Sequence, residues 1–155
     1  MVQTIPARIA KVLDRLHAEA AEDAGRWQAR VGTTDPATLK AGGGDLVRLG
    51  EFYLAVTPDE GRFLHILART KGAANVVEFG ASYGLSSLYL AAAIEGRGGR
   101  LTTTEVHPDK CAALRRTFDE AGVADTVTLL EGDARETLAD VEGPIDMLVL
   151  DGWKS

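Results

Sequence analysis

Short apolar runs alternate with longer amphipathic segments along the second half of the chain. Four runs rich in β-branched or apolar residues, at positions 76–78, 100–105, 126–130 and 145–150, have the length of strands. Segments 85–94, 108–122 and 135–140 lie between them and have the composition of helices. Strands that alternate with helices predict an α/β fold with a parallel sheet, whose ligands bind outside the carboxyl ends of the strands.

The first third of the chain is predicted to be a helical segment followed by a mobile loop. From residue 6 to about 29, apolar residues recur at helical spacing, with charged residues on the opposite side. Three uses are open for this apolar stripe: docking on the core, covering a substrate, or pairing with another subunit. Positions 33–44 contain a proline and three consecutive glycines, which favour a mobile connection. We therefore expect a helical segment over 1–55 and a ligand-binding domain over 56–155.

A capping box predicts a helix immediately before the first strand. Thr57 has the hydroxyl of an N-cap, proline follows it, and Glu60 stands three residues after it. The helix is predicted to run to residue 71 and to stop at glycine 72. Its apolar residues are expected to face inward, whereas His65 is expected at the surface. The inward residues would be Phe63, Leu64, Leu67 and Ala68.

The turn after the first strand is the candidate ligand cradle. The dinucleotide fingerprint G-x-G-x-x-G places glycine where the backbone approaches a pyrophosphate, but here the spacing is G-x-x-x-G, from Gly80 to Gly84. Ser82 would crowd a pyrophosphate, yet its hydroxyl could bond the amino-acid end of a ligand. The helix N-terminus suits an anion and Glu78 suits a cation, so a ligand such as S-adenosylmethionine is favoured over an ordinary structural turn.

An acidic residue stands at or just after the end of each predicted strand. These residues are Glu78, Glu105, Asp133 and Asp151. A carboxylate at the end of the second strand can accept both hydroxyls of a ribose, which is the role we expect for Glu105. Asp133 and Ala134 are placed to meet an adenine edge through a side-chain oxygen and a backbone N–H. Any one of these acids could be a solvated turn residue, but four at one edge favour a binding site.

Charge and composition limit the partners. The chain has 155 residues, a net charge of -6 and dispersed Lys and Arg, which argues against nucleic acid and favours a small molecule. A single cysteine excludes an internal disulfide, and no apolar signal core precedes residue 6, so a cytoplasmic location is expected. The longest apolar run, 88–94, is too short to span a membrane.

Four motifs together resemble a known family. The motifs are residues 78–84 (EFGASYG), 104–108 (TEVHP), 132–134 (GDA) and 150–154 (LDGWK). They resemble the class I S-adenosylmethionine-dependent methyltransferases, and within them the metal-dependent O-methyltransferases that include catechol O-methyltransferase. The resemblance implies a Rossmann-like, doubly wound parallel sheet. It also implies O-methylation of a small hydroxylated, catechol-like acceptor.

The resemblance assigns roles to individual positions. The methionine part of the cofactor would be surrounded by Glu78, Gly80, Ser82, Gly84 and Ser86, the ribose by Glu105, and the adenine by Asp133 and Ala134. Asp151 would be one carboxylate ligand of Mg²⁺, Lys154 the general base that takes the acceptor's proton, and Trp153 a wall beside the adenine or the substrate. Gly152 stands where the catechol enzyme has a histidine, so that imidazole contact is absent.

The class I fold has seven strands, whereas this chain stops just beyond the fourth. The fifth strand and the Asp-Asn pair that completes the metal site in this family are not within the sequence. Residues 145–150 are nearly continuously apolar, as in a strand buried on both faces, so an uncovered edge is a liability. We therefore expect that the C-terminal half is missing, or that a partner covers the edge, for example in a homodimer.

Two other functions stay open at this point. The incomplete metal site leaves room for a non-catalytic cofactor-binding or interaction domain. A nicotinamide-dependent oxidoreductase is disfavoured by the G-x-x-x-G spacing and by the Asp-x-Trp-Lys ending.

Overall fold

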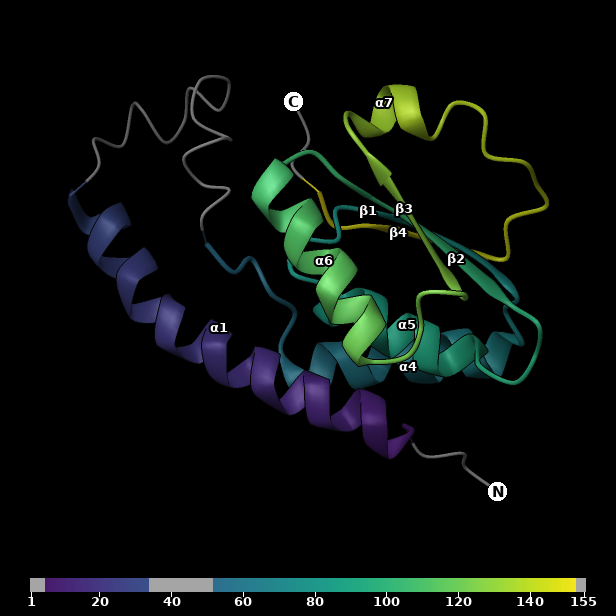
Figure 1. Cartoon of the computed structure of the whole chain (residues 1–155), viewed down its shortest axis with the longest axis horizontal. Coiled ribbons are helices and arrows are strands. Elements are labelled where there is room, and N and C mark those ends of the chain that lie inside the picture. Colours follow the sequence, from purple (N-terminus) through teal and green to yellow (C-terminus); the bar gives the residue numbers. More distant parts are fainter. Residues whose placement is uncertain (1–4, 34–51, 153–155) are drawn as a thin grey trace.

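The computed structural model describes residues 5–33 and 52–152 (Figure 1). The predicted mobile connection, Trp153 and Lys154 lie outside the described residues. The elements, in chain order, are α1 (Ala7–Thr33), α4 (Pro58–Lys71), β1 (Asn75–Phe79), α5 (Leu85–Ile94), β2 (Arg100–Glu105), α6 (Pro108–Glu120), β3 (Val127–Glu131), α7 (Ala134–Thr137) and β4 (Met147–Leu150). The predicted alternation of strands and helices is confirmed, with boundaries shifted by a few residues.

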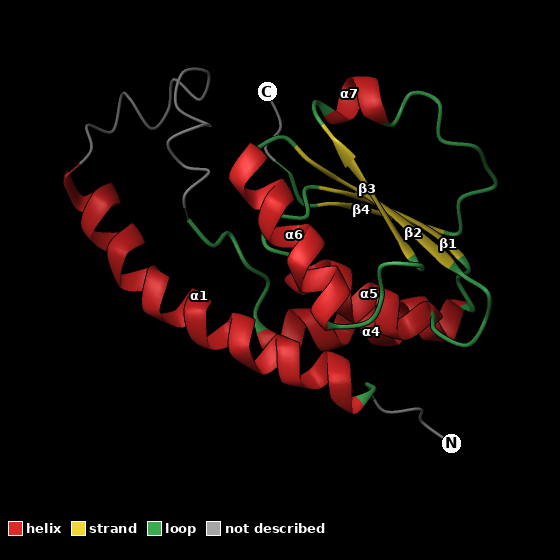
Figure 2. Ribbon diagram, in the orientation of Figure 1, coloured by secondary structure: helices red, strands yellow, loops and turns green. Residues whose placement is uncertain are grey.

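The strands form one parallel sheet in the order β3-β2-β1-β4. Phe79, the last residue of β1, is level with Thr104 on β2 and Leu150 on β4. Figure 2 shows the four strands running in the same direction within a single layer. The turns that follow the strands therefore meet at one edge of the sheet, as parallel α/β topology requires.

Helices α5 and α6 pack against one face of the sheet, α4 packs on α5, and α1 lies across the outside against α5 and α6 (Figure 1). Every residue of α5 is buried, as expected for a helix between the sheet and α4. The first half of α1 docks on the core through Ile9, Val12, Leu13 and Leu16, each at most 3% exposed. Docking, one of the three uses left open by the sequence, is thus confirmed for this half. The second half of α1 continues toward the edge where the strands end.

The capping box that begins α4 is present. The Thr57 hydroxyl accepts from the Glu60 backbone N–H at 3.3 Å, and the Glu60 carboxylate accepts from the Thr57 backbone N–H at 2.7 Å. Gly72 ends the helix in the left-handed conformation with φ 70°. Both ends of α4 are therefore set by the local sequence, as predicted.

The prediction of which α4 residues face inward was correct for Ala68 and partly correct for Leu64, but wrong for Phe63, Leu67 and His65. The buried face consists of Gly61, His65 and Ala68. Phe63 is 60% exposed and Leu67 is 42% exposed, while Leu64 is half-buried. The cause is the ring of Tyr89 on α5, which lies where a side chain at Gly61 would stand, 2.1 Å from a Cβ built there. That contact turns α4 so that His65 faces inward, where its Nδ1 lies 3.1 Å from the carbonyl oxygen of Tyr89.

β4 is an edge strand within the described part of the chain and pairs with β1 alone. Met147 and Val149 pack against the core, whereas Leu148 and Leu150 are 52% and 55% exposed on the other face. Apolar side chains are thus exposed on the strand that the sequence marked as needing cover. Among the described residues, no helix is long and apolar enough to cross a bilayer.

Candidate functional site

The turn between β1 and α5 has the sharp backbone that its glycines predict. Gly80 and Gly84 adopt φ values of 94° and 95°, and Ser82 is in the left-handed region with φ 50°. A Cβ at Gly80 would lie 2.7 Å from the Cα of Gly152, so the missing side chain lets the ends of β1 and β4 approach each other. Gly84 is the N-cap of α5, with no side chain bonded to the first turn. The first turn of α5 therefore has backbone N–H groups that no side chain caps, although Gly84, Leu85 and Ser86 are buried.

Glu105 connects the turn to the end of β2. Its Oε2 accepts from the backbone N–H of Ser82 at 2.9 Å. Its Oε1 accepts from the backbone N–H groups of Val106 and His107 at 2.8 and 2.9 Å. Because one carboxylate binds both loops, it holds the first and second strand ends in a fixed relation. Glu105 is only half-buried, so lone pairs on its oxygens remain open to a further donor.

Glu78 is buried inside the protein and is not exposed at the edge where the strands end. It is fully buried, and its Oε2 accepts from the hydroxyls of Ser87 and Thr103, the latter at 2.6 Å. Its Oε1 is buried without a hydrogen-bond partner among the described residues. Burial raises the pKa of this carboxyl, and hydrogen bonds from neighbouring hydroxyls, including that of Ser86, oppose the rise. The expectation of four acids at one rim therefore holds for three of them.

Asp133 and Ala134 follow β3 at the same edge. Asp133 is the N-cap of α7, and its carboxylate accepts from the backbone N–H and the guanidinium of Arg135. These hydrogen bonds lower the pKa of Asp133 to about 2. The carboxylate is therefore ionised at neutral pH and already has a partner, while Ala134 is half-buried beside it. Asp151, after β4, is exposed.

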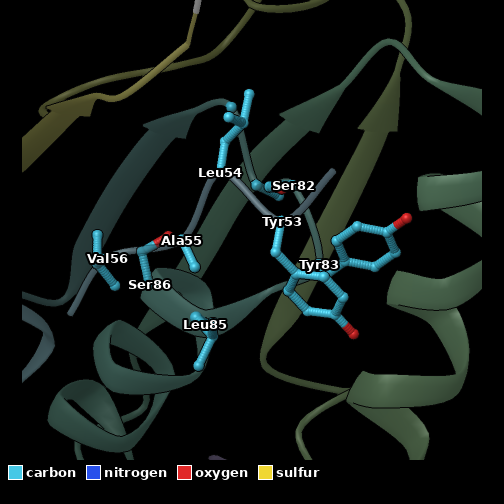
Figure 3. A pocket seen from close by; sticks show the side chains of 10 residues that line it. Tyr53, Leu54, Ala55, Val56, Ser82, Tyr83, Leu85 and Ser86 are labelled. Atoms are coloured by element: carbon cyan, nitrogen blue, oxygen red, sulfur yellow. The ribbon is translucent and has the colours of Figure 1, made fainter. Parts of the chain in front are cut away.

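Two adjoining cavities lie beside the turn. The smaller one, about 10 Å³, is enclosed by residues 53–56 and 80–86 except Gly84, and it has room for about one water molecule (Figure 3). The larger one is an open groove of 690 Å³ that shares residues 53–56 as a wall. Ala24 and Trp27 of α1 line its other side, and Asp151 and Gly152 lie at its edge. The second half of α1 thus contributes to a concave surface at the strand ends.

The wall between the cavities is tied to α1 and to the glycine turn. The rings of Tyr53 and Tyr83 stack with centroids 4.1 Å apart, and Figure 3 shows them side by side. The Tyr53 hydroxyl donates to the Glu19 carboxylate, and its backbone N–H donates to Asp23 at 2.7 Å. Burial, followed by the bond to Glu19, raises the pKa of Tyr53, so its phenol is protonated at neutral pH. α1 therefore positions a residue that contacts the turn.

Sequence reasoning missed two residues of this site, Tyr53 and Lys110. Lys110 lies in the first turn of α6, is 3% exposed, and donates from Nζ to the Ser82 hydroxyl at 3.0 Å. A cation at a helix N-terminus opposes the helix dipole, and that placement was the one available signal. Tyr53 adjoins the stretch assigned to a mobile loop, and nothing in the local pattern marks it.

Potential metal ligands are dispersed over the described residues. Within residues 5–33 and 52–152, no three His, Cys, Asp or Glu side chains gather as a set that could hold an ion. Asp151 is the described residue that the sequence assigned to a metal, and a single carboxylate does not make a magnesium site.

Comparison with known proteins gives a consistent family. The family model described as O-methyltransferase matches residues 46–154. A catechol O-methyltransferase of Niastella koreensis is 33% identical over 80% of this chain and 57% of its own length. A catechol O-methyltransferase of Mycobacterium tuberculosis is 36% identical over 65% of this chain and 46% of its own length. The chain thus spans about half the length of the curated relatives it matches.

Solved structures agree with this family. The O-methyltransferase TomG of Streptomyces achromogenes, in complex with SAM, has a TM-score of 0.61 and 33% identity over 77% of this chain and 55% of its own. An O-methyltransferase of Bacillus cereus, in complex with SAH, also has a TM-score of 0.61, with 25% identity over 84% of this chain and 60% of its own. The shared fold and these cofactor complexes agree with the resemblance found in the sequence motifs.

Proposed function

We propose that this chain, which belongs to the O-methyltransferase family, binds S-adenosylmethionine at the glycine turn and forms the cofactor-binding part of an enzyme that methylates a small hydroxylated acceptor. The observation that carries the proposal is the hydrogen bond from the Ser82 backbone N–H to Glu105. This bond joins Ser82, which follows β1, to Glu105 at the end of β2, and so supports one binding site that spans the two neighbouring strand ends.

The residues present fit the chemistry of this cofactor. Backbone groups and hydroxyls at the start of α5, from Gly80, Ser82, Gly84 and Ser86, would hold the methionine part. Glu105 would accept from the ribose hydroxyls, and Asp133 and Ala134 would border the adenine. Glu78 offers a buried carboxylate oxygen without a donor, directly beneath the turn. A ligand that carries an ammonium, a carboxylate and two ribose hydroxyls would engage each of these groups.

Methyl transfer needs alignment more than covalent machinery. The cofactor would supply a methyl group on a sulfonium. Attack of an acceptor oxygen on that methyl carbon would form the O–C bond and break the C–S bond in line, which releases a neutral thioether, and the acceptor's proton would pass to the predicted general base, Lys154. The protein's share is to hold the acceptor oxygen against the methyl carbon and to exclude water. The groove of 690 Å³ adjoins the turn through residues 53–56, and Trp27 and Leu54 give it an apolar lining suited to an aromatic ring. We assign the acceptor to this groove.

The finer parts of the proposal concern the acceptor, the base and the metal. The names of the curated relatives support a catechol-like acceptor. Lys154 keeps its predicted role as general base and Trp153 as a wall, and both lie outside the described residues. Dependence on Mg²⁺ stays a prediction because the described residues contribute Asp151 alone, and we derive no step through a metal.

A second candidate function is a cofactor-binding module without turnover. The apolar side chains of Leu148 and Leu150, exposed on β4, would suit contact with another protein surface and favour this alternative. A nicotinamide-dependent oxidoreductase is disfavoured, because Ser82 occupies the place where a pyrophosphate-binding turn has glycine.

Two experiments with the chain test these functions. Titration calorimetry with S-adenosylhomocysteine and with NAD⁺ should show binding of the former; binding of NAD⁺ alone would reject the methyltransferase proposal. Methyl transfer from S-adenosylmethionine to a panel of catechols, with and without Mg²⁺, then separates enzyme from binding module. Turnover supports the first, whereas cofactor binding with no turnover on any acceptor supports the second. Lys154→Met should then lower turnover while leaving cofactor affinity unchanged.

A further inference from the structure

Lys110 is a buried lysine beneath the glycine turn. Its residue exposure is 3%, although it lies in the first turn of a helix near the sheet edge. Its Nζ donates to the Ser82 hydroxyl at 3.0 Å and stands 5.1 Å from the centre of the Tyr83 ring. Both contacts are to consecutive residues of the turn, so the ammonium is directed at the turn itself.

This placement is costly for the protein. Among the residues that the structure describes, the ammonium makes one hydrogen bond and pairs with no carboxylate at salt-bridge distance. Burial lowers the pKa of Lys110, while the more distant charges of Glu105 and Asp23 act in the opposite direction. A buried cation with one hydrogen bond and one aromatic face is incompletely compensated. A methionine could fill the same space without that cost, so packing alone does not account for the ammonium.

Ser82 is the residue that the ammonium restrains. It is the one non-glycine residue with positive φ among those described, a conformation that serine adopts only when its surroundings hold it there. Glu105 binds its backbone N–H and Lys110 binds its side chain, so two opposite charges fix it from two elements. Because the hydroxyl accepts from Lys110, its own hydrogen is left to donate elsewhere.

Tyr83 extends the same restraint to α1. One face of its ring stacks on Tyr53, which is bonded to Glu19 and Asp23 of α1, and the Lys110 ammonium lies within cation–π distance of the ring. The turn is thereby held between α6 and the helix that also lines the groove.

We propose that Lys110 is a positioning residue for the cofactor turn, acting through the Ser82 hydroxyl and the Tyr83 ring to hold the turn ready for S-adenosylmethionine. The inference rests on the proposed function for its ligand. It goes beyond that function by assigning a role to a residue that acts on the cofactor through Ser82 and Tyr83. The turn is then preorganised by a charge that the apo protein keeps buried, which lowers the ordering cost of binding.

The test measures S-adenosylhomocysteine affinity by calorimetry for wild type, Lys110→Met, Ser82→Ala and the double variant. Lys110→Met removes a charge-assisted hydrogen bond and should weaken binding by roughly tenfold. Ser82→Ala removes the acceptor of the same bond together with the hydroxyl that the proposed function places against the methionine part, so it should weaken binding at least as much. The double variant should bind S-adenosylhomocysteine no more weakly than the single variant with the lower affinity, because the two substitutions remove the same Lys110–Ser82 hydrogen bond.

A matched control and a folding check keep the result interpretable. Lys11→Met makes the same chemical change at an exposed position on α1 and should leave affinity unchanged. If Lys110→Met does not fold, Lys110→Gln takes its place in the cycle, since it removes the charge and keeps the Ser82 hydroxyl and a hydrogen-bond donor at position 110. Wild-type affinity in either folded variant, or losses that simply add in the double variant, would overturn the role of Lys110. Absence of binding by the wild type would instead reject the proposed function.

Discussion

Replacing Glu105 with Gln tests how the turn and the ribose site are joined. The carboxylate accepts three backbone N–H groups, those of Ser82, Val106 and His107, at 2.8 to 2.9 Å. A glutamine has one oxygen and one amino group in place of the two oxygens. It can keep the two bonds to the β2 end, but its amino group then faces the N–H of Ser82, donor against donor.

The magnitude follows from the bonds lost. Hydrogen bonds to charged groups contribute about 1.5–3 kcal/mol, and 1.4 kcal/mol corresponds to about tenfold in affinity. Glu105→Gln loses the bond to the turn and weakens the expected bonds to the ribose, so we expect S-adenosylhomocysteine to bind roughly 10 to 100 times more weakly. Because Glu105 is half-buried and water can replace part of what is lost, we expect the unfolding free energy to fall by only about 1–2 kcal/mol.

Calorimetry with S-adenosylhomocysteine and with its 2′-deoxy analogue separates the two roles. If Glu105 accepts the 2′-hydroxyl, wild type should bind the 2′-deoxy analogue more weakly than S-adenosylhomocysteine. Glu105→Gln should then lower the affinity for the analogue by a smaller factor than the affinity for S-adenosylhomocysteine. Glu131→Gln is the matched control. Glu131 pairs with Glu105 in the β2–β3 register, is exposed, and lies outside both cavities. Wild-type affinity in Glu105→Gln, or equal losses for the two ligands, would refute the ribose assignment.

Three further predictions concern single contacts. A Cβ at Gly152 would lie 2.5 Å from the Phe79 ring, so Gly152→Ala should lower the unfolding free energy by about 1–3 kcal/mol in urea denaturation. A second substitution, Phe79→Leu, should restore part of the lost stability. An unchanged unfolding free energy in Gly152→Ala would contradict this packing. Tyr53→Phe, which keeps the ring but loses the bond to a carboxylate, should cost about 1 kcal/mol of stability by the same assay, and no loss would show that the bond is absent in solution. Burial raises the pKa of Glu78 above its ordinary 4.5, so the folded state holds this proton longer and the contribution of Glu78 to stability declines as pH rises through the raised pKa. Glu78→Gln should therefore gain stability relative to wild type as pH rises above 4.5, and a pH-independent difference would contradict the burial.

The sequence was sufficient to predict the sheet and the turn because their determinants are local. The β-branched runs and the glycines at 80 and 84 define strand, turn and helix without reference to distant parts of the chain. The capping box before α4 likewise needs only four consecutive residues. The predicted start and end of this helix therefore agree with the structure.

The rotation of α4 could not be predicted from its own residues. Its apolar side chains suggested one buried face, but the contact between Gly61 and Tyr89 turned another face inward. Those residues are far apart in sequence, and a glycine within a helix does not reveal which aromatic ring will fill its place. His65 became buried as a consequence of this packing.

In the functional site, too, features set by local sequence could be predicted, and features set by contacts between distant residues could not. Glu105 was located correctly because strand ends in a parallel sheet meet at one edge, whatever the loops do. Glu78 was expected at that edge, yet its strand register directs it at α5, where Ser87 binds it. The ammonium of Lys110 contacts Ser82 and Tyr83, which lie in a turn far from α6 in sequence, so the residues around Lys110 do not reveal this contact.

The most direct test of the account is a crystal structure of the chain with S-adenosylhomocysteine. We predict that the nucleoside lies along the ends of β1, β2 and β3, with its amino-acid part at the turn of Gly80, its ribose hydroxyls on Glu105 and its adenine beside Asp133. A ligand bound elsewhere on the chain, or a ribose that makes no contact with Glu105, would contradict it.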